Sequence, residues 1–124
     1  MFGGKGPDGK ATNDMLLLKT NEFKMERIET SGPIPGKRRY HSSAVINEKL
    51  YIYGGLGKGV SDEIHCLDTN SREWLSITTK GDVPKTRWFT SSFFNFSDQL
   101  YLFGGQTVKG YKSCNDLNVF NIET

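Results

Sequence analysis

The stretch Leu50-Tyr51-Ile52-Tyr53-Gly54-Gly55 decides the fold, because it returns almost unchanged as Leu100-Tyr101-Leu102-Phe103-Gly104-Gly105. The end of the same motif stands near the start of the chain, as Phe2-Gly3-Gly4. The glycine pairs are therefore 51 and then 50 residues apart. A period of this length is typical of propellers and other repeat arrays.

A second motif repeats with nearly the same period as the first. Gly32-x-x-Pro35-x-x-Arg38 returns 49 residues later as Gly81-x-x-Pro84-x-x-Arg87. After each glycine pair comes a loop of variable length, a polar residue and an apolar stretch, at 13–18, 62–67 and 115–120. Trp74 follows the second of these stretches, and Met25 takes the equivalent place after the first. The chain is therefore a true repeat.

One period contains four strand-like stretches, at 41–46, 49–53, 64–68 and 74–77, which we name strands a, b, c and d. Asn47-Glu48 predicts a tight turn between a and b, and 68–71 supplies turn residues between c and d. Strand b is apolar from Leu50 to Tyr53, as expected of a strand covered on both faces. Four short antiparallel strands between neighbours describe one blade of a β-propeller.

The predicted fold class is all-β: a propeller fragment made of four-stranded antiparallel blades. Residues 1–30 are expected to form an incomplete blade with strands b, c and d, residues 38–79 a complete blade, and residues 87–124 an incomplete blade with strands a, b and c. Propellers close with about four to eight blades. The chain is thus expected to be too short to close one alone and to be a piece of a longer protein.

These motifs resemble the Kelch repeat. Arg38-Arg39-Tyr40-His41-Ser42-Ser43 is similar to the family's Arg-x-x-His-Ser-Ser opening of strand a, although the next copy has Thr90 in place of the histidine. The resemblance implies a protein-interaction module without catalysis of its own. We expect the repeat arginines to bind backbone carbonyls and the tryptophan to pack in the space beside the glycine pair. The structural Kelch positions are Gly3, Gly4, Gly54, Gly55, Gly104, Gly105, Trp74, Arg38 and Arg87.

The sequence offers little chemistry beyond the repeat. Gly4-Lys5-Gly6-Pro7-Asp8-Gly9-Lys10 fits the first part of a phosphate-binding loop, but Ala11 replaces the required hydroxyl residue and a strand follows instead of a helix. His41, His65, Cys66 and Cys114 lack the spacing of a metal site. We therefore expect no cofactor, no metal and no catalytic residue.

Composition limits the class of partner and the location. The 124 residues include 16 Lys and Arg and 14 Asp and Glu. The resulting net charge of +2 does not by itself predict nucleic-acid binding. The longest apolar run, Met15-Leu16-Leu17-Leu18, is too short to cross a membrane, and nothing marks the chain for secretion. Cys66 is expected to be a buried free thiol. The predicted location is cytoplasmic.

In Kelch propellers the d–a and b–c loops share one face, which here we call the loop face. Its loops, 5–12, 31–39, 56–61, 80–88 and 106–113, are the longer and more variable set. Variable loops on a rigid framework are the usual place for recognition, and Trp, Tyr and Arg most often anchor interfaces. The candidate partner-binding residues are Arg39, Lys58, Lys85, Trp88, Lys109 and Tyr111.

Three functions remain open at this stage. The first is a scaffold or adaptor module that binds another protein, the second a regulatory domain of a larger enzyme such as a Kelch-containing phosphatase, and the third an intrinsic Kelch-type enzyme. Because the terminal blades would expose apolar sides, we also expect a homodimer that completes a ring of six blades.

Overall fold

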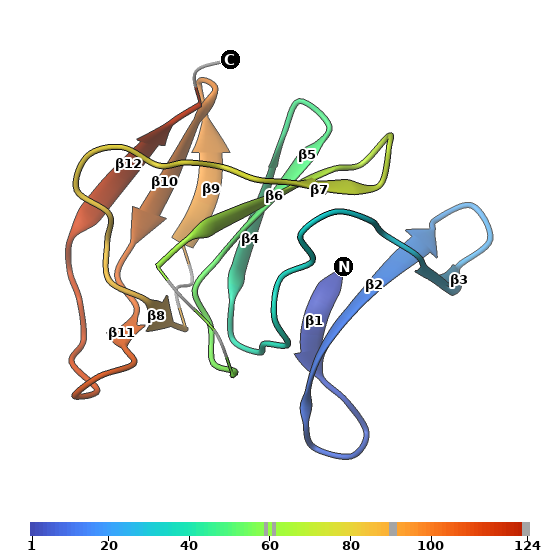
Figure 1. Ribbon diagram of the computed structural model, residues 1–124, viewed down its shortest axis with the longest axis horizontal. Coiled ribbons are helices and arrows are strands. Elements are labelled where there is room, and N and C mark those ends of the chain that lie inside the picture. Colours follow the sequence, from blue (N-terminus) through green and yellow to red (C-terminus); the bar gives the residue numbers. More distant parts are fainter. Residues whose placement is uncertain (59, 61, 90–91, 123–124) are drawn as a thin grey trace.

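Three antiparallel sheets follow one another across the molecule in chain order (Figure 1). The computed structural model describes residues 1–58, 60, 62–89 and 92–122. The described residues contain strands and loops but no helix, and the three sheets do not close into a ring. The prediction of an all-β propeller fragment is therefore confirmed.

The middle sheet has four strands in the order β4-β5-β6-β7, and the two outer sheets have three strands each. The first sheet has the order β1-β2-β3 and the third the order β12-β10-β9. The bounds of these strands are β1 (Phe2–Lys5), β2 (Ala11–Lys19), β3 (Lys24–Ile28), β4 (Ser42–Ile46), β5 (Lys49–Tyr53), β6 (Ile64–Asp68), β7 (Glu73–Leu75), β9 (Ser92–Phe96), β10 (Gln99–Phe103) and β12 (Leu117–Asn121).

Two-residue turns fix the register of the a–b hairpins. In the middle sheet Ile46 pairs with Lys49, and both Asn47 and Glu48 have positive φ, at 46° and 61°. The third sheet repeats this turn at Ser97 and Asp98, with φ of 51° and 60°. Positive φ at both central residues defines the type I′ turn, whose twist matches that of paired strands.

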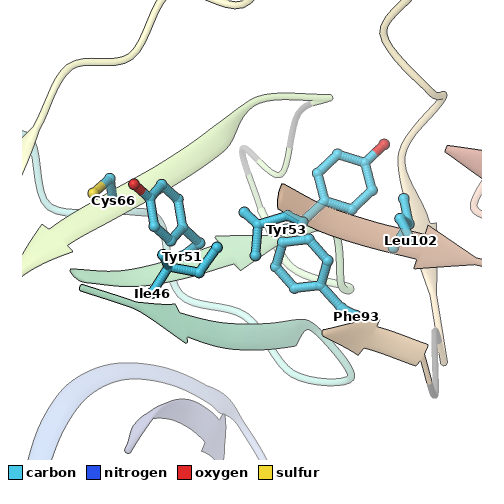
Figure 2. Close-up of a cluster of buried hydrophobic side chains, with 7 residues drawn as sticks. Ile46, Tyr51, Tyr53, Cys66, Phe93 and Leu102 are labelled. Carbon is cyan, nitrogen blue, oxygen red and sulfur yellow. The ribbon is translucent and has the colours of Figure 1, made fainter. Parts of the chain in front are cut away.

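Side chains from neighbouring sheets form two apolar clusters. Tyr51 and Tyr53 of β5 face the third sheet and pack with Phe93, Leu100 and Leu102 (Figure 2). Ile52, between those tyrosines in sequence, faces the first sheet instead and is fully buried with Phe2, Met15, Leu67 and Trp74. Strand β5 is therefore covered on both faces, which confirms the interpretation of its apolar run.

Trp88 lies in a separate short strand, β8 (Arg87–Trp88), which pairs with β11 (Gln106–Thr107) in the loop after β10. Among the described residues, strand a of this sheet begins only at Ser92. Thr90, which replaces the repeat histidine, lies outside the described residues. The short β8–β11 pair lies on the loop face (Figure 1).

The outer faces of the first and third sheets are apolar and uncovered. Leu18 and Met25 are each about half exposed on the first sheet, and the equivalent Leu67 and Trp74 of the middle sheet are buried. On the third sheet Phe94, Phe96, Phe103, Leu117 and Val119 are exposed. The ring of Phe94 stacks on that of Tyr101, with 5.5 Å between centroids.

The part of the chain that the structure describes has no helix able to cross a membrane.

Candidate protein-interaction surface

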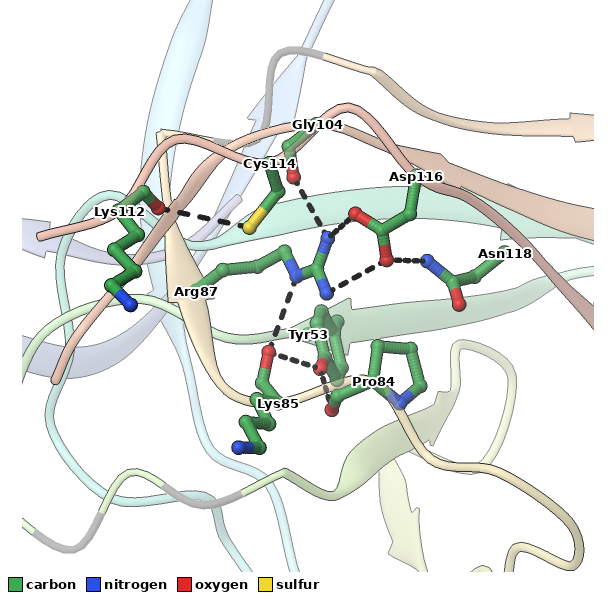
Figure 3. Close-up of polar contacts among 9 residues, drawn as sticks. All are labelled: Tyr53, Pro84, Lys85, Arg87, Gly104, Lys112, Cys114, Asp116 and Asn118. Carbon is green, nitrogen blue, oxygen red and sulfur yellow. Dashed lines mark hydrogen bonds and ion pairs between the residues drawn. The ribbon is translucent and has the colours of Figure 1, made fainter. Parts of the chain in front are cut away.

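Two buried arginines hold the loop face in place. The Arg38 guanidinium donates to the carbonyls of Gly36 and Gly54, at 3.0 and 3.3 Å. Arg87 repeats this arrangement with the carbonyls of Lys85 and Gly104, at 3.2 and 3.1 Å (Figure 3). Both side chains are almost completely buried. The prediction that the repeat arginines bind backbone carbonyls is confirmed.

The glycine pairs make room for these arginine linkers. Gly54 has φ of 68°, and a β-carbon at this position would lie 2.2 Å from the carbonyl oxygen of Arg87. Gly3 has φ of 62° and is constrained in the same way but less tightly, because a β-carbon there would lie 2.9 Å from the carbonyl oxygen of Arg38. Glycine is therefore required both for positive φ and for close backbone approach.

Trp74 has a different role from the expected one. We placed its ring beside the glycine pair, but the nearest atoms there belong to the arginine linkers and to His41. The indole instead packs between the first two sheets, with its ring centroid 5.1 Å from that of Phe2, and donates to the Thr30 hydroxyl at 3.1 Å. Its burial still confirms the packing interpretation. The equivalent Met25 is exposed because the outer face of the first sheet is uncovered.

An ion pair ties the Arg87 linker to the third sheet. The Asp116 carboxylate accepts two hydrogen bonds from Arg87, at 2.7 and 3.1 Å, and one from the Asn118 amide at 2.7 Å. These contacts, with Arg87 first, lower the pKa of Asp116 to about 2. At neutral pH the carboxylate is therefore charged and holds the base of the loop face rigid.

Arg38 has two histidine neighbours instead. Its guanidinium lies 3.3 Å from Nε2 of His65, and the Nδ1 atom of His41 is buried with no hydrogen-bond partner among the described residues. Burial, followed by the charge of Arg38, lowers the pKa of both histidines. Both imidazoles are therefore neutral at physiological pH, and Nε2 of His65 accepts a hydrogen bond from Arg38.

Four aromatic side chains gather on the loop face, namely Tyr40, Trp88, Phe89 and Tyr111, which we call the aromatic cluster. Phe89 is the closest neighbour of Tyr40, at 4.4 Å between ring centroids, and lies 5.0 Å from Trp88. Tyr111 reaches Trp88 from the loop after β10, at 5.9 Å. The guanidinium of Arg39 lies 5.3 Å from the centre of the Tyr40 ring. Two linkers and one b–c loop thus contribute to a single surface.

The backbone of this cluster is strained. Tyr40, Phe89 and Tyr111 have φ of 59°, 52° and 50°, a region that bulky residues rarely adopt. The same three side chains are 40, 56 and 68% exposed, so burial of apolar surface does not compensate for the strain. Strained residues of this kind concentrate at functional sites.

A groove of about 600 Å³ lies next to the aromatic cluster. Lys85 and Thr86, from the linker that leads into β8, form one wall, and the loop after β10 forms another with Lys109 and Lys112. The remaining lining residues are Gly55, Leu56, Gly57, Val60, Asp62, Thr107 and Val108. The groove is thus lined by three lysines and by one carboxylate from the described residues.

The structure brings together most of the candidate residues. Trp88 and Tyr111 belong to the aromatic cluster, Lys85 and Lys109 line the groove, and Arg39 lies against Tyr40. Lys58 is exposed beside Gly57 but does not line the groove.

Sequence reasoning missed Tyr40, Phe89 and Lys112. Tyr40 and Phe89 stand 49 residues apart, so a signal was present: an aromatic residue follows Arg39 and Trp88 at the same repeat position. Nothing in the repeat pattern distinguishes Lys112, because its loop differs in length from the other copies.

Metal binding, phosphate binding and thiol chemistry are the other functions for which the described residues offer candidate groups. They contain no group of three or more His, Cys, Asp and Glu side chains that could hold a metal ion. The segment that resembles a phosphate-binding loop joins β1 to β2 in a hairpin, so a strand follows it, as predicted. Cys66 is a buried free thiol, also as predicted.

The fold defines a class: a fragment of a repeat β-propeller, with consecutive antiparallel sheets joined by loops on one face. A family model, the KLHDC2/KLHL20/DRC7 Kelch-repeats domain, matches residues 1–124. The chain therefore belongs to the Kelch-repeat family.

Three relatives illustrate the range of this similarity. Kelch domain-containing protein 3 of Bos taurus is 32% identical over the whole chain, which spans 35% of that protein. Host cell factor homolog hcf-1 of Caenorhabditis elegans is 37% identical over 72% of the chain and 11% of its own length. The N-(sulfonatooxy)prop-2-enimidothioate sulfolyase of Thlaspi arvense is 33% identical over 73% of the chain and 27% of its own length. The chain thus spans about a third or less of these relatives.

Proposed function

We propose that this chain is a protein-interaction module without catalysis of its own, and that it binds its partner at the loop face. The aromatic cluster is the observation that supports this proposal most directly. The rings of Tyr40, Phe89 and Tyr111 are exposed, and their backbone is strained. Three of the four cluster residues stand on linkers fixed by buried arginines. Tyr, Trp and Arg on a rigid base are the side chains that most often anchor a protein interface.

The test compares two exposed aromatic residues on opposite sides of the molecule. Tyr111 and Phe23 both have φ of 50° and both are largely exposed, but Phe23 lies in the turn between β2 and β3, away from the loop face. We expect the immobilised Tyr111→Ser variant to retain about tenfold less partner than the unaltered chain. This corresponds to an interface anchor that contributes at least about 1.4 kcal/mol of binding free energy. Phe23→Ser should retain the same partners as the unaltered chain. Quantitative mass spectrometry of the retained proteins measures both.

Catalysis is the second candidate function, and the similarity to a protein named as a sulfolyase favours it. Under this alternative the groove would hold a small substrate. A chain that converts an N-(sulfonatooxy)prop-2-enimidothioate would contradict the proposal of a binding module.

We also propose a cytoplasmic location. Both cysteines are free thiols, with Cys66 buried, and free thiols are usual in reducing compartments.

A further inference from the structure

The groove beside the aromatic cluster is basic because its lysines lack partners. No ion pair joins Lys85, Lys109 or Lys112 to a carboxylate in the described part of the chain. Asp62, which also lines the groove, accepts hydrogen bonds from the backbone N–H and the hydroxyl of Thr86. That carboxylate is therefore already engaged on the groove wall.

Lys85 is directed away from the ion pair between Arg87 and Asp116, as Figure 3 shows. The backbone beneath is fixed, because Lys85 contributes its carbonyl to Arg87 and to the Tyr53 hydroxyl. Mobile ammonium groups on a fixed backbone suit several carboxylates better than one rigid anion.

The groove continues into the aromatic cluster along the chain. Lys85 and Thr86 lead directly into β8, whose Trp88 belongs to the cluster, and the loop after β10 supplies both Lys109 and Tyr111. A ligand lying along the groove would therefore meet positive charge first and aromatic rings next.

We propose that this groove binds an extended acidic segment of a protein partner, with carboxylate side chains at the lysines and an apolar side chain against the aromatic cluster. The inference rests on the proposed function and names the partner's chemistry. Charge complementarity gives such a groove specificity and a fast association rate. An extended segment of about ten residues, with about 3.3 Å per residue, is long enough to follow both surfaces.

A peptide accounts for the surface better than a single-stranded nucleic acid does. Proteins that bind single strands present free ring faces on which successive bases stack. Here the rings of Tyr40, Trp88 and Phe89 lie against one another, with centroids 4.4 to 6.0 Å apart. Rings packed in this way leave edges and partial faces, which suit an aliphatic or aromatic side chain.

Fluorescence anisotropy tests the inference directly. The probe is a peptide of about ten residues composed of Glu, Leu and Gly, with a fluorescent label at its N-terminus and an amide at its C-terminus. The label is chosen to be uncharged, so that with the amide the side-chain carboxylates are the only anions of the peptide. We expect saturable binding that weakens with added salt, and at least about tenfold weaker binding when every Glu is replaced by Gln.

Matched variants locate the binding site. Lys85→Glu with Lys109→Glu should weaken binding of the Glu peptide at least about tenfold, and the milder pair Lys85→Gln with Lys109→Gln should weaken it in the same direction. Lys49→Glu with Arg72→Glu makes the same charge change away from the loop face and should leave binding unchanged. Circular dichroism confirms that each variant is folded.

Several results would overturn the inference: no saturable binding of the Glu peptide, equal binding of its Gln counterpart, equal weakening by the control pair, or tighter binding of an oligothymidine of the same length. If the peptide fails to bind but Tyr111→Ser still releases partners, only the groove assignment is wrong. If Tyr111→Ser and Phe23→Ser retain the same partners, the proposed function itself is wrong.

Discussion

At the scale of single residues, the glycine pairs combine positive φ with close backbone contact. A glycine pair after an apolar strand permits positive φ, and Gly54, Gly55, Gly104 and Gly105 all adopt it. The neighbour of Gly54 was not predictable from the sequence, because the carbonyl that approaches it belongs to Arg87, 33 residues further along the chain. Tyr40 and Phe89 were missed for a related reason: only the folded linkers bring them together.

Substitution of two glycines separates close approach from backbone strain. Gly54 and Gly81 both have positive φ, but a β-carbon at Gly54 would meet the Arg87 carbonyl, whereas none of the described atoms lies within 4 Å of one at Gly81. Gly81→Ala should cost about 1 kcal/mol through φ alone. Gly54→Ala should cost at least about 3 kcal/mol, since the linker must also move. Urea unfolding measures both, and equal losses would show that backbone approach is unimportant.

At the scale of strands and linkers, sequence reasoning found the sheets but not the short strands between them. The four stretches of the period match β4 to β7 within one or two residues, because turn residues and apolar patterns mark them. No such sequence pattern marks the pair β8–β11, because each strand has only two residues and the pair forms where two loops contact each other. The groove and the aromatic cluster depend on this contact between loops, so neither was predictable as a site.

Because of the ion pair between the Arg87 linker and the third sheet, the stability of the fold should depend on pH in the acidic range. Asp116 has its pKa lowered to about 2, against about 3.9 in an unfolded chain, so its contribution is present above about pH 4 and is lost as the pH falls toward 2. We expect Asp116→Asn to lower the unfolding temperature at pH 7, and the difference from the unaltered chain to shrink below pH 4.

Asp82→Asn serves as the control for this prediction, because Asp82 forms no ion pair in the described part of the chain. Thermal unfolding followed by circular dichroism between pH 2 and pH 7 measures the difference. A constant difference between the unaltered chain and Asp116→Asn over this range would contradict the assigned role of the carboxylate.

At the scale of the whole molecule, the outer faces of the first and third sheets are uncovered. Their equivalents in the middle sheet are the two faces that pack against neighbouring sheets. Leu18 and Met25 are the equivalents of Leu67 and Trp74, which face the preceding sheet. Tyr101 and Phe103 are the equivalents of Tyr51 and Tyr53, which face the following sheet. The outer face of the first sheet therefore has the character needed to cover the outer face of the third.

We propose that the isolated 124-residue chain pairs through these faces with a second copy, head to tail about a twofold axis, in a ring of six sheets. Six lies within the range in which propellers close. Light scattering at tens of micromolar should give twice the chain mass of 14.0 kDa. Leu18→Glu with Phe103→Glu should give the single mass, whereas a stable 14.0 kDa species without substitution would rule the pairing out.

The two arginine junctions have a consequence for how such a protein changes in length during evolution. The Arg38 side chain binds the Gly54 carbonyl of its own sheet, and its own carbonyl accepts from the Gly4 N–H of the sheet before. Arg87 does the same with Gly104 and Gly55. Both junctions therefore use the same backbone contacts. A gene duplication or deletion of one whole period leaves each remaining junction intact, so lineages can gain or lose repeats without inventing a new contact.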